Sequence, residues 1–383
     1  MTEPMLRCAT QRDIEGIANL LSSVFLYDGI PIVQTAEEIE EEFVAPHCNI
    51  EHDVIVVECE GALAGVAYTY FLPSETKEER CYIFGGVLPQ FRGRGFGSML
   101  MDWATKHAED LLNSTGRTLP KFIRTDVSQQ NESAARLFAK LGMRAVRYEE
   151  DLIRSLENIP EIRVPFEYTI TTWDMARNEE ARTVKNLAFD DHWGSTPTSS
   201  EMWLQLTQGS TARIGHSFFA LNQKNEIVGL LLTHRFESDD ELLGMKIGWI
   251  DKLATLAEHR KQSIGKNLLR HALSSYLSDG LTHAALTVDT QNPTGAYGLY
   301  ESIGFGFFRG KVTFELSTAQ PIEGQPKPCR LAHSRHSHAG PSGVFQRVAS
   351  GDEHDSHGGL SCLVPSIGIE PTTCGSGNRR SIH

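Results

Sequence analysis

The spacing of apolar residues predicts the same succession of strands and helices in two successive stretches of the chain. Short apolar-rich runs predict strands in both: 54–58, 62–70 and 82–87 in the first stretch, and 217–221, 227–233 and 246–255 in the second. Apolar residues spaced three and four apart then predict a helix in each: Leu100, Met101, Ala104 and Ala108, and later Leu268, Leu269, Ala272, Leu273 and Leu277. A plan that recurs at the length of a domain indicates two repeats.

The residues after each helix extend the repeat. Each helix is followed by a strand-like run, at 122–127 and at 284–289. An asparagine, an aromatic residue and a glycine flanked by apolar residues come next: Asn131, Phe138 and 141–143 in the first stretch, and Asn292, Tyr300 and 303–305 in the second. We predict two α/β (α+β) repeats, each with a mixed, mostly antiparallel sheet and helices on both faces. The predicted boundaries are 1–155 and 165–318, joined by a linker at 156–164.

Residues 319–383 have a different composition. From Gly324 onwards this stretch holds three of the seven cysteines and six of the fifteen histidines, among glycine, serine and proline residues without periodicity. We expect a disordered low-complexity tail, because such a composition cannot bury a core. The histidine and cysteine spacings match no zinc pattern, so a non-native extension is the preferred explanation.

The run Arg92-Gly93-Arg94-Gly95-Phe96-Gly97 lies between a predicted strand and a predicted helix. Glycines there let the backbone turn tightly and approach a ligand, and the first helical turn presents unpaired N–H groups at the positive end of the dipole. A pyrophosphate fits such a site. In the second stretch Arg260-Lys261-Gln262-Ser263-Ile264-Gly265 takes the same place, with a small serine where the first run has a glycine.

The spacing Arg-x-x-Gly-x-Gly after a strand resembles the coenzyme A pyrophosphate loop of the GNAT acetyltransferase superfamily, and the resemblance covers about residues 5–316. It implies that acetyl-CoA is the co-substrate, held by the loop, the strand before it and a later asparagine. The residues that the resemblance assigns to coenzyme binding are Gly85, Gly86, Val87, Arg92, Gly93, Arg94, Gly95, Phe96, Gly97, Asn131, Leu253, Ala254, Thr255, Arg260, Lys261, Gln262, Ser263, Ile264, Gly265 and Asn292. The tandem arrangement resembles the mycothiol synthase family, in which the second repeat is catalytic and the first keeps a coenzyme site.

The resemblance also implies a proton donor on the late helix and a carboxylate on the strand before the loop. Tyr300 lies in a match to the pattern A-x-x-x-Y-x-x-x-G-F, and Asp251 lies on the corresponding strand; the first repeat has Phe138 instead and no carboxylate at 81–84. We therefore predict catalysis in the second repeat, with Tyr300 as acid and Asp251, or a water that it orients, as base. A half-buried packing role for Tyr300 and a salt bridge from Asp251 to Lys252 are the structural alternatives.

Asp191, His192 and Trp193 follow the first helix of the second repeat, in a segment that borders the acceptor site in this family. A carboxylate beside an aromatic ring can hold an amine by charge and by cation–π contact, so we predict substrate binding here. A helix C-terminal turn with ordinary packing is the alternative.

Charge and composition narrow the class of partner. The net charge of −13 argues against a nucleic acid, and no apolar run approaches the roughly 18 residues of a membrane span. No signal-peptide pattern and no disulfide or metal spacing is present, so we expect a cytoplasmic monomer or homodimer without a metal. The predicted function is transfer of an acetyl group from acetyl-CoA to a primary amine of a small molecule. A non-catalytic acyl-CoA-binding regulatory module is the alternative, and O-acetylation or another acyl group stays open.

Overall fold

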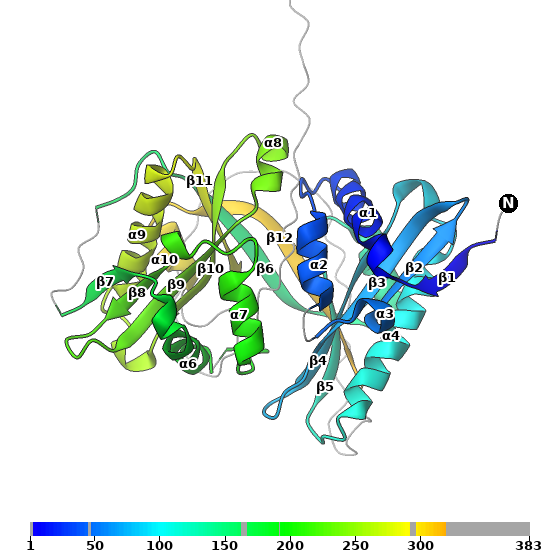
Figure 1. Cartoon of the computed structure of the whole chain (residues 1–383), viewed down its shortest axis with the longest axis horizontal. Helices are drawn as coiled ribbons and strands as arrows, with labels where there is room; N and C mark the ends of the chain where they lie inside the picture. Colours follow the sequence, from blue (N-terminus) through cyan, green and yellow to red (C-terminus); the bar gives the residue numbers. More distant parts are fainter. Residues whose placement is uncertain (1–2, 45–46, 162–166, 191, 292–295, 319–383) are drawn as a thin grey trace, which may run out of the picture.

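The computed structural model describes residues 3–44, 47–161, 167–190, 192–291 and 296–318. The predicted tail at 319–383 lies outside the described residues, as do parts of the predicted linker. The described chain forms two lobes that share a central sheet (Figure 1).

The strands of the first repeat are β1 (Met5–Cys8), β2 (Val54–Cys59), β3 (Ala62–Leu72), β4 (Glu79–Val87), β5 (Lys121–Ser128) and β6 (Arg144–Ser155). Its helices are α1 (Ile14–Tyr27), α2 (Ala36–Val44), α3 (Ile50–Asp53), α4 (Phe96–Ser114) and α5 (Glu132–Lys140). The second repeat has the strands β7 (Thr169–Thr172), β8 (Phe218–Leu221), β9 (Ile227–Arg235), β10 (Ile247–Thr255), β11 (His283–Asp289) and β12 (Gly306–Ser317). Its helices are α6 (Asn178–Ala188), α7 (Ser200–Gln208), α8 (Asp240–Leu243), α9 (Ile264–Ser278) and α10 (Ala296–Glu301). The predicted order of elements in both repeats is confirmed.

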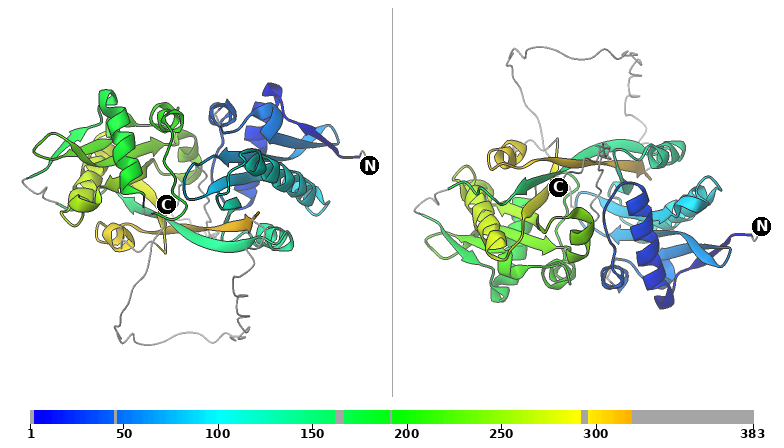
Figure 2. Two further views of the ribbon diagram at one scale, coloured as in Figure 1. Left: turned by 90° about the horizontal axis from the view of Figure 1, so that it is seen from below. Right: turned by 90° about the horizontal axis from the view of Figure 1, so that it is seen from above.

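The last strand of each repeat completes the sheet of the other repeat. β6 pairs with β11, with Glu149 opposite Asp289, while β12 pairs with β5, with Lys311 opposite Ser128. β6 and β12 also pair with each other along most of their length. The result is one 12-stranded sheet in the order β1-β2-β3-β4-β5-β12-β6-β11-β10-β9-β8-β7, in which the two long exchanged strands run across both lobes (Figure 2).

The predicted mixed sheet with helices on both faces is confirmed. Only β4–β5 and β10–β11 pair in parallel among the described strands; the other pairs are antiparallel. Alternation along β2 shows the two faces, since Ile55 and Val57 pack with α4, whereas Val54 and Val56 pack with α1 and α2. In the second repeat, α9 covers one face and α6 and α7 cover the other.

The strand exchange carries apolar side chains into the opposite core. Val312 and Phe314 of β12 are buried in the first repeat beside α4, and the fully buried Leu152 of β6 lies in the second repeat beside α9. Near the middle of the molecule, α2 and α7 lie side by side (Figure 1), and Glu41 of α2 accepts hydrogen bonds from the backbone N–H and hydroxyl of Ser210. Each core therefore depends on both repeats.

Cutting the chain between the repeats should not separate them. We expect that a protease site placed between residues 161 and 167 yields two fragments that co-elute in native size-exclusion chromatography, because each fragment holds a strand buried in the other's core. The fragment 1–161 expressed alone should fail to give a folded monomer, because β5 and β6 lose their partners β12 and β11. Recovery of two separate, folded monomers after cleavage would contradict the exchanged arrangement.

Candidate functional site

Each repeat has one place where two parallel strands part. β4 pairs with β5 only as far as Tyr82 and Arg124, although β4 continues to Val87. β10 pairs with β11 only as far as Ile250 and Leu286, although β10 continues to Thr255. Beyond these points the strands diverge, and a cavity occupies the opening: about 570 Å³ in the first repeat and about 850 Å³ in the second. We call them the first cavity and the second cavity.

The two glycine-type loops share one backbone conformation. Gly93 and Gly95 have φ angles of 75° and 89°, and Lys261 and Ser263 at the matching places have φ angles of 63° and 61°. The left-handed region costs a residue with a side chain about 1 kcal/mol, so the second loop keeps this shape at a cost that glycine avoids. In both repeats the loop leads directly into a helix, α4 or α9, whose N-terminus opens onto the cavity. The unpaired N–H groups of that turn fit a pyrophosphate.

The first arginine of each loop fastens the loop to the rest of the repeat. Arg92 donates to the carbonyl of Val87 at 3.0 Å and forms a two-point ion pair with Asp28, at 2.6 and 3.0 Å. Arg260 donates to the carbonyl of Thr255 at 3.2 Å and to that of Ala188 at 2.9 Å. Both guanidinium groups thus join the end of the strand before the loop to the end of the first long helix. Sequence reasoning assigned these arginines to the coenzyme, and the structure gives them a shaping role at the edge of each cavity.

Most of the predicted coenzyme residues line the two cavities. In the first cavity they are Gly85, Gly86, Val87, Arg92, Gly93, Gly95, Gly97 and Asn131. In the second they are Leu253, Ala254, Thr255, Arg260, Lys261, Ser263, Ile264 and Gly265. Asn131 also caps α5, since its side-chain oxygen accepts from the N–H of Ala134 at 3.0 Å. Asn292 lies outside the described residues.

Three other predicted coenzyme residues point elsewhere. Arg94 contacts the sulfur of Cys59 and pairs with Glu60, and the ring of Phe96 is buried in the core beside α4. The side-chain oxygen of Gln262 accepts a hydrogen bond from the hydroxyl of Tyr168 at 2.8 Å. The residue types alone did not reveal which side chains of each loop turn away from its cavity.

Asp251 lies at a β-bulge in β10. The register between β9 and β10 shifts between Ile250 and Lys252, so Asp251 is the extra residue, whereas β3 and β4 pair without a shift. A bulge re-aims a side chain, and this one directs the carboxylate towards the second cavity. Its Oδ1 accepts from the ammonium group of Lys252 at 2.8 Å, which confirms the salt bridge weighed from the sequence.

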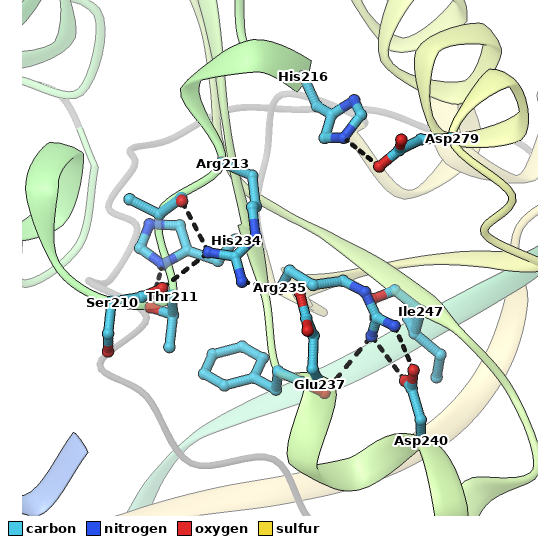
Figure 3. A network of polar contacts seen from close by, with 12 residues as sticks. Ser210, Thr211, Arg213, His216, His234, Arg235, Glu237, Asp240, Ile247 and Asp279 are labelled. Carbon is cyan, nitrogen blue, oxygen red and sulfur yellow. Dashed lines mark hydrogen bonds and ion pairs between the residues drawn. The ribbon is translucent and has the colours of Figure 1, made fainter. Parts of the chain in front are cut away.

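The other carboxylate oxygen of Asp251 faces a histidine. Oδ2 of Asp251 lies 3.8 Å from Nε2 of His234, and both atoms are buried without a hydrogen-bond partner among the described residues. Nδ1 of His234 is hydrogen-bonded to the hydroxyl of Thr211 at 2.9 Å (Figure 3). Ion pairs of Arg213 with Glu237 and of Arg235 with Asp240 hold the surrounding segment (Figure 3).

These neighbours set the charge of Asp251. Burial alone would raise the pKa of Asp251, but the attraction of Lys252, together with His234 and Lys185, outweighs it and lowers the pKa. Burial lowers the pKa of His234, while the nearby carboxylate of Asp251 opposes this shift. Asp251 is therefore a carboxylate over the neutral pH range.

Tyr300 of α10 lines the same cavity as Asp251. Burial raises the pKa of Tyr300 to about 12, so its hydroxyl keeps its proton at neutral pH. At the matching place in the first repeat, Phe138 packs against Phe314 of β12 with ring centroids 5.4 Å apart. The second cavity thus combines a phenol and a carboxylate beside a loop of the coenzyme type.

The predicted acceptor segment divides between the second cavity and the junction of the repeats. His192 lines the second cavity, while the ring of Trp193 packs on the guanidinium of Arg124, 4.1 Å away, and on that of Arg147. Asp191 lies outside the described residues. Trp193 therefore joins the second repeat to strands of the first, which favours a packing role for it.

Sequence reasoning missed two charged residues of the second cavity. Lys185 of α6 is buried at the cavity wall, and its ammonium group donates to the hydroxyl of Thr198 at 2.5 Å. Glu149 of β6 reaches the cavity from the first repeat and pairs with Lys311 of β12 at 2.7 Å. A lysine at an apolar position of an amphipathic helix was a usable signal for Lys185. Nothing in the sequence indicated that Glu149 lines the second cavity, because its position there follows from the strand exchange.

The profile of the acetyltransferase (GNAT) family matches the chain twice, at residues 19–143 and 181–305. The chain belongs to the GNAT acetyltransferase family. Each match includes one glycine-type loop and the parted strands beside it. Members of this family are acyltransferases that use acyl-CoA, and the two cavities lie at the loops and parted strands that the two matches include.

Solved structures show the same tandem GNAT fold. One is a GCN5-related N-acetyltransferase from Sphaerobacter thermophilus, with a TM-score of 0.66 and 23% identity over 83% of this chain and 97% of that one. Another is a tandem GNAT protein from the clavulanic acid biosynthesis pathway, with a TM-score of 0.62 and 14% identity over 83% of this chain and 100% of that one. At these identities the likeness concerns the fold alone. No curated protein matches the chain.

Within the described ranges, no helix has the length and apolar character needed to cross a membrane. Over the same part of the chain, no three or more histidine, cysteine, aspartate or glutamate side chains gather in a way that could hold a metal ion.

Removing the charge of Lys252 should change the pH dependence of any reaction that needs Asp251 ionised. In Lys252→Met the main cause of the lowered pKa is lost, so the pKa of Asp251 should rise towards the value that burial favours. We expect the acid limb of kcat/KM to move to higher pH. Lys246→Met, an exposed lysine just before the same strand, is the control and should leave the limb in place. Identical limbs in Lys252→Met and wild type would show that Asp251 is not the titrating group.

Proposed function

We propose that the chain is an acetyl-CoA-dependent N-acetyltransferase that acts on a primary amine of a small molecule, with the reaction in the second cavity. The observation that carries this proposal is the meeting of Asp251, Tyr300 and the 260–265 loop in one cavity. The family membership supports acyl transfer from a coenzyme A thioester.

The reaction needs an amine nitrogen in its neutral form next to the thioester carbonyl. Asp251 lines the cavity and is ionised, so it attracts an ammonium group towards this part of the cavity. A carboxylate with a lowered pKa is a weak base, so Asp251 suits the holding of the ammonium and the orientation of a water that takes the proton better than direct removal of it. The hydrogen bond from Lys252 holds this carboxylate in position.

Transfer then exchanges one bond for another. The amine nitrogen bonds to the carbonyl carbon, the carbon–sulfur bond breaks, and the thiolate of coenzyme A leaves. Tyr300 holds its proton at neutral pH and donates it to this thiolate. The nitrogen loses its extra proton to water, which in turn restores the proton of Tyr300. The backbone of β10 beyond Ile250, which is not paired with β11, is free to hydrogen-bond the pantetheine arm.

The first cavity supports binding better than catalysis. Phe138 cannot donate a proton, and residues 81–84 of β4 include no carboxylate. The two carboxylates that line this cavity are engaged: Asp28 with Arg92, and Asp126 with the hydroxyl of Thr313 at 2.6 Å. We propose that the first repeat binds a coenzyme A thioester without turning it over.

Replacing Tyr300 with phenylalanine tests the assignment of Tyr300 as the proton donor in the second cavity. Tyr300→Phe keeps the ring and removes only the proton donor, so kcat should fall about 10²-fold, at the low end of general acid catalysis, while the affinity for acetyl-CoA stays the same. The matched control is Tyr297→Phe on the same helix, whose hydroxyl donates to Glu150 and which does not line the cavity. The measurement is release of free thiol from acetyl-CoA with a panel of primary amines and amino sugars.

Three outcomes would contradict the proposal. Full activity of Tyr300→Phe would remove Tyr300 from the reaction, and a gain of activity in Phe138→Tyr would place chemistry in the first cavity. A chain that binds acetyl-CoA but releases no thiol with any acceptor would favour the non-catalytic binding module.

A further inference from the structure

The two cavities differ where the thioester would lie. β4 places Ile83 and Phe84 at the first cavity directly before its last three residues, whereas β10 places Asp251 and Lys252 at the second cavity directly before its last three. The same stretch of the fold is thus apolar in the first repeat and charged in the second.

The first long helix of each repeat shows the same contrast. Phe25 of α1 and Phe189 after α6 line their cavities at matching places, and the residue four positions earlier is Leu21 in one and Lys185 in the other. Val24 and Ile30 extend the apolar wall of the first cavity. The corresponding wall of the second cavity includes His192 and Ser195.

Several polar groups that line the first cavity near this apolar wall are held by partners. Arg92 covers Asp28, Thr313 donates to Asp126, and Lys311 is paired with Glu149. Tyr68 donates its hydroxyl to Glu42 at 3.3 Å. An apolar wall next to a coenzyme loop excludes a charged acceptor and favours a hydrocarbon group.

We infer that the first cavity binds a coenzyme A thioester whose acyl chain is apolar and longer than acetyl. This inference rests on the proposed coenzyme site of the first repeat. The acyl chain continues from the thioester, at the parting of β4 and β5, along Phe84 towards Leu21, Val24 and Phe25 of α1, which pack on the same face of the sheet. The second cavity places charges on this path, so it takes the short acetyl group.

The test measures the affinity of the full-length protein, with its second cavity blocked, for a series of coenzyme A thioesters. Gly265 and Gly97 occupy matching positions in the first turns of α9 and α4. An added Cβ would lie 3.8 Å from Leu299 at Gly265 and 3.4 Å from Leu137 at Gly97. Gly265→Val places a branched side chain at the N-terminus of α9, where a pyrophosphate would bind in the second site, and leaves the first site open. Calorimetric titration of this variant with coenzyme A and its acetyl, butanoyl, hexanoyl and octanoyl thioesters gives one Kd for each chain length.

We expect the Kd to fall with chain length by up to about fourfold per methylene, and by at least about tenfold between acetyl and hexanoyl. Equal Kd values from acetyl to octanoyl, or tightest binding of acetyl-CoA, would overturn the inference while leaving the coenzyme site in place. Failure of coenzyme A and of every thioester to bind would instead overturn the proposed coenzyme site itself.

Substitutions along the proposed path test where the acyl chain lies. In the Gly265→Val background, Leu21→Lys copies the second repeat and should abolish the dependence on chain length while coenzyme A still binds. Phe84→Asp, at a half-buried position, is a second variant with the same expected result and less risk to the core. The control Lys185→Leu lies in the blocked cavity and should keep the wild-type dependence. An unchanged dependence in folded Leu21→Lys and Phe84→Asp, judged by melting temperature, would contradict the assigned path.

Discussion

Each half of the central sheet is completed by a strand from the other half. β12 joins β5 through Val312 and Phe314, and β6 joins β11 through Leu152. Neither core closes without the opposite repeat, so the two lobes form one cooperative unit, although the sequence reads as two successive repeats. The exchange also fixes the distance between the two cavities, because β6 and β12 lie between them.

The same exchange gives each cavity a wall residue from the other repeat. Lys311 of the second repeat lines the first cavity, Glu149 of the first repeat lines the second, and the two side chains form a buried pair. The scaffold of each site is otherwise shared: parted strands, a left-handed loop and a helix N-terminus. Function therefore differs through a few side chains, with Asp251 and Tyr300 in one repeat and Phe84 and Phe138 in the other.

The repeats, the glycine-type loops and the type of sheet could be predicted because they follow from local periods and from spacing. The exchange of β6 and β12 could not, because which strand a closing strand pairs with depends on contacts far along the chain. For Arg92 and Arg260, the motif showed that an arginine is present but not that its guanidinium turns back to a strand and a helix. The bulge at Asp251 was equally hidden, although it decides where the carboxylate points.

The central claim is that the first cavity only binds a coenzyme A thioester, whereas the second cavity carries out acetyl transfer. Turnover of acetyl-CoA by Gly97→Val and Gly265→Val, with the same amine acceptor, tests it most directly. The account predicts that Gly265→Val abolishes thiol release, whereas Gly97→Val retains most of it, because only the second cavity holds the carboxylate and the phenol. Loss of turnover in Gly97→Val with normal turnover in Gly265→Val would contradict it and place the reaction in the first repeat.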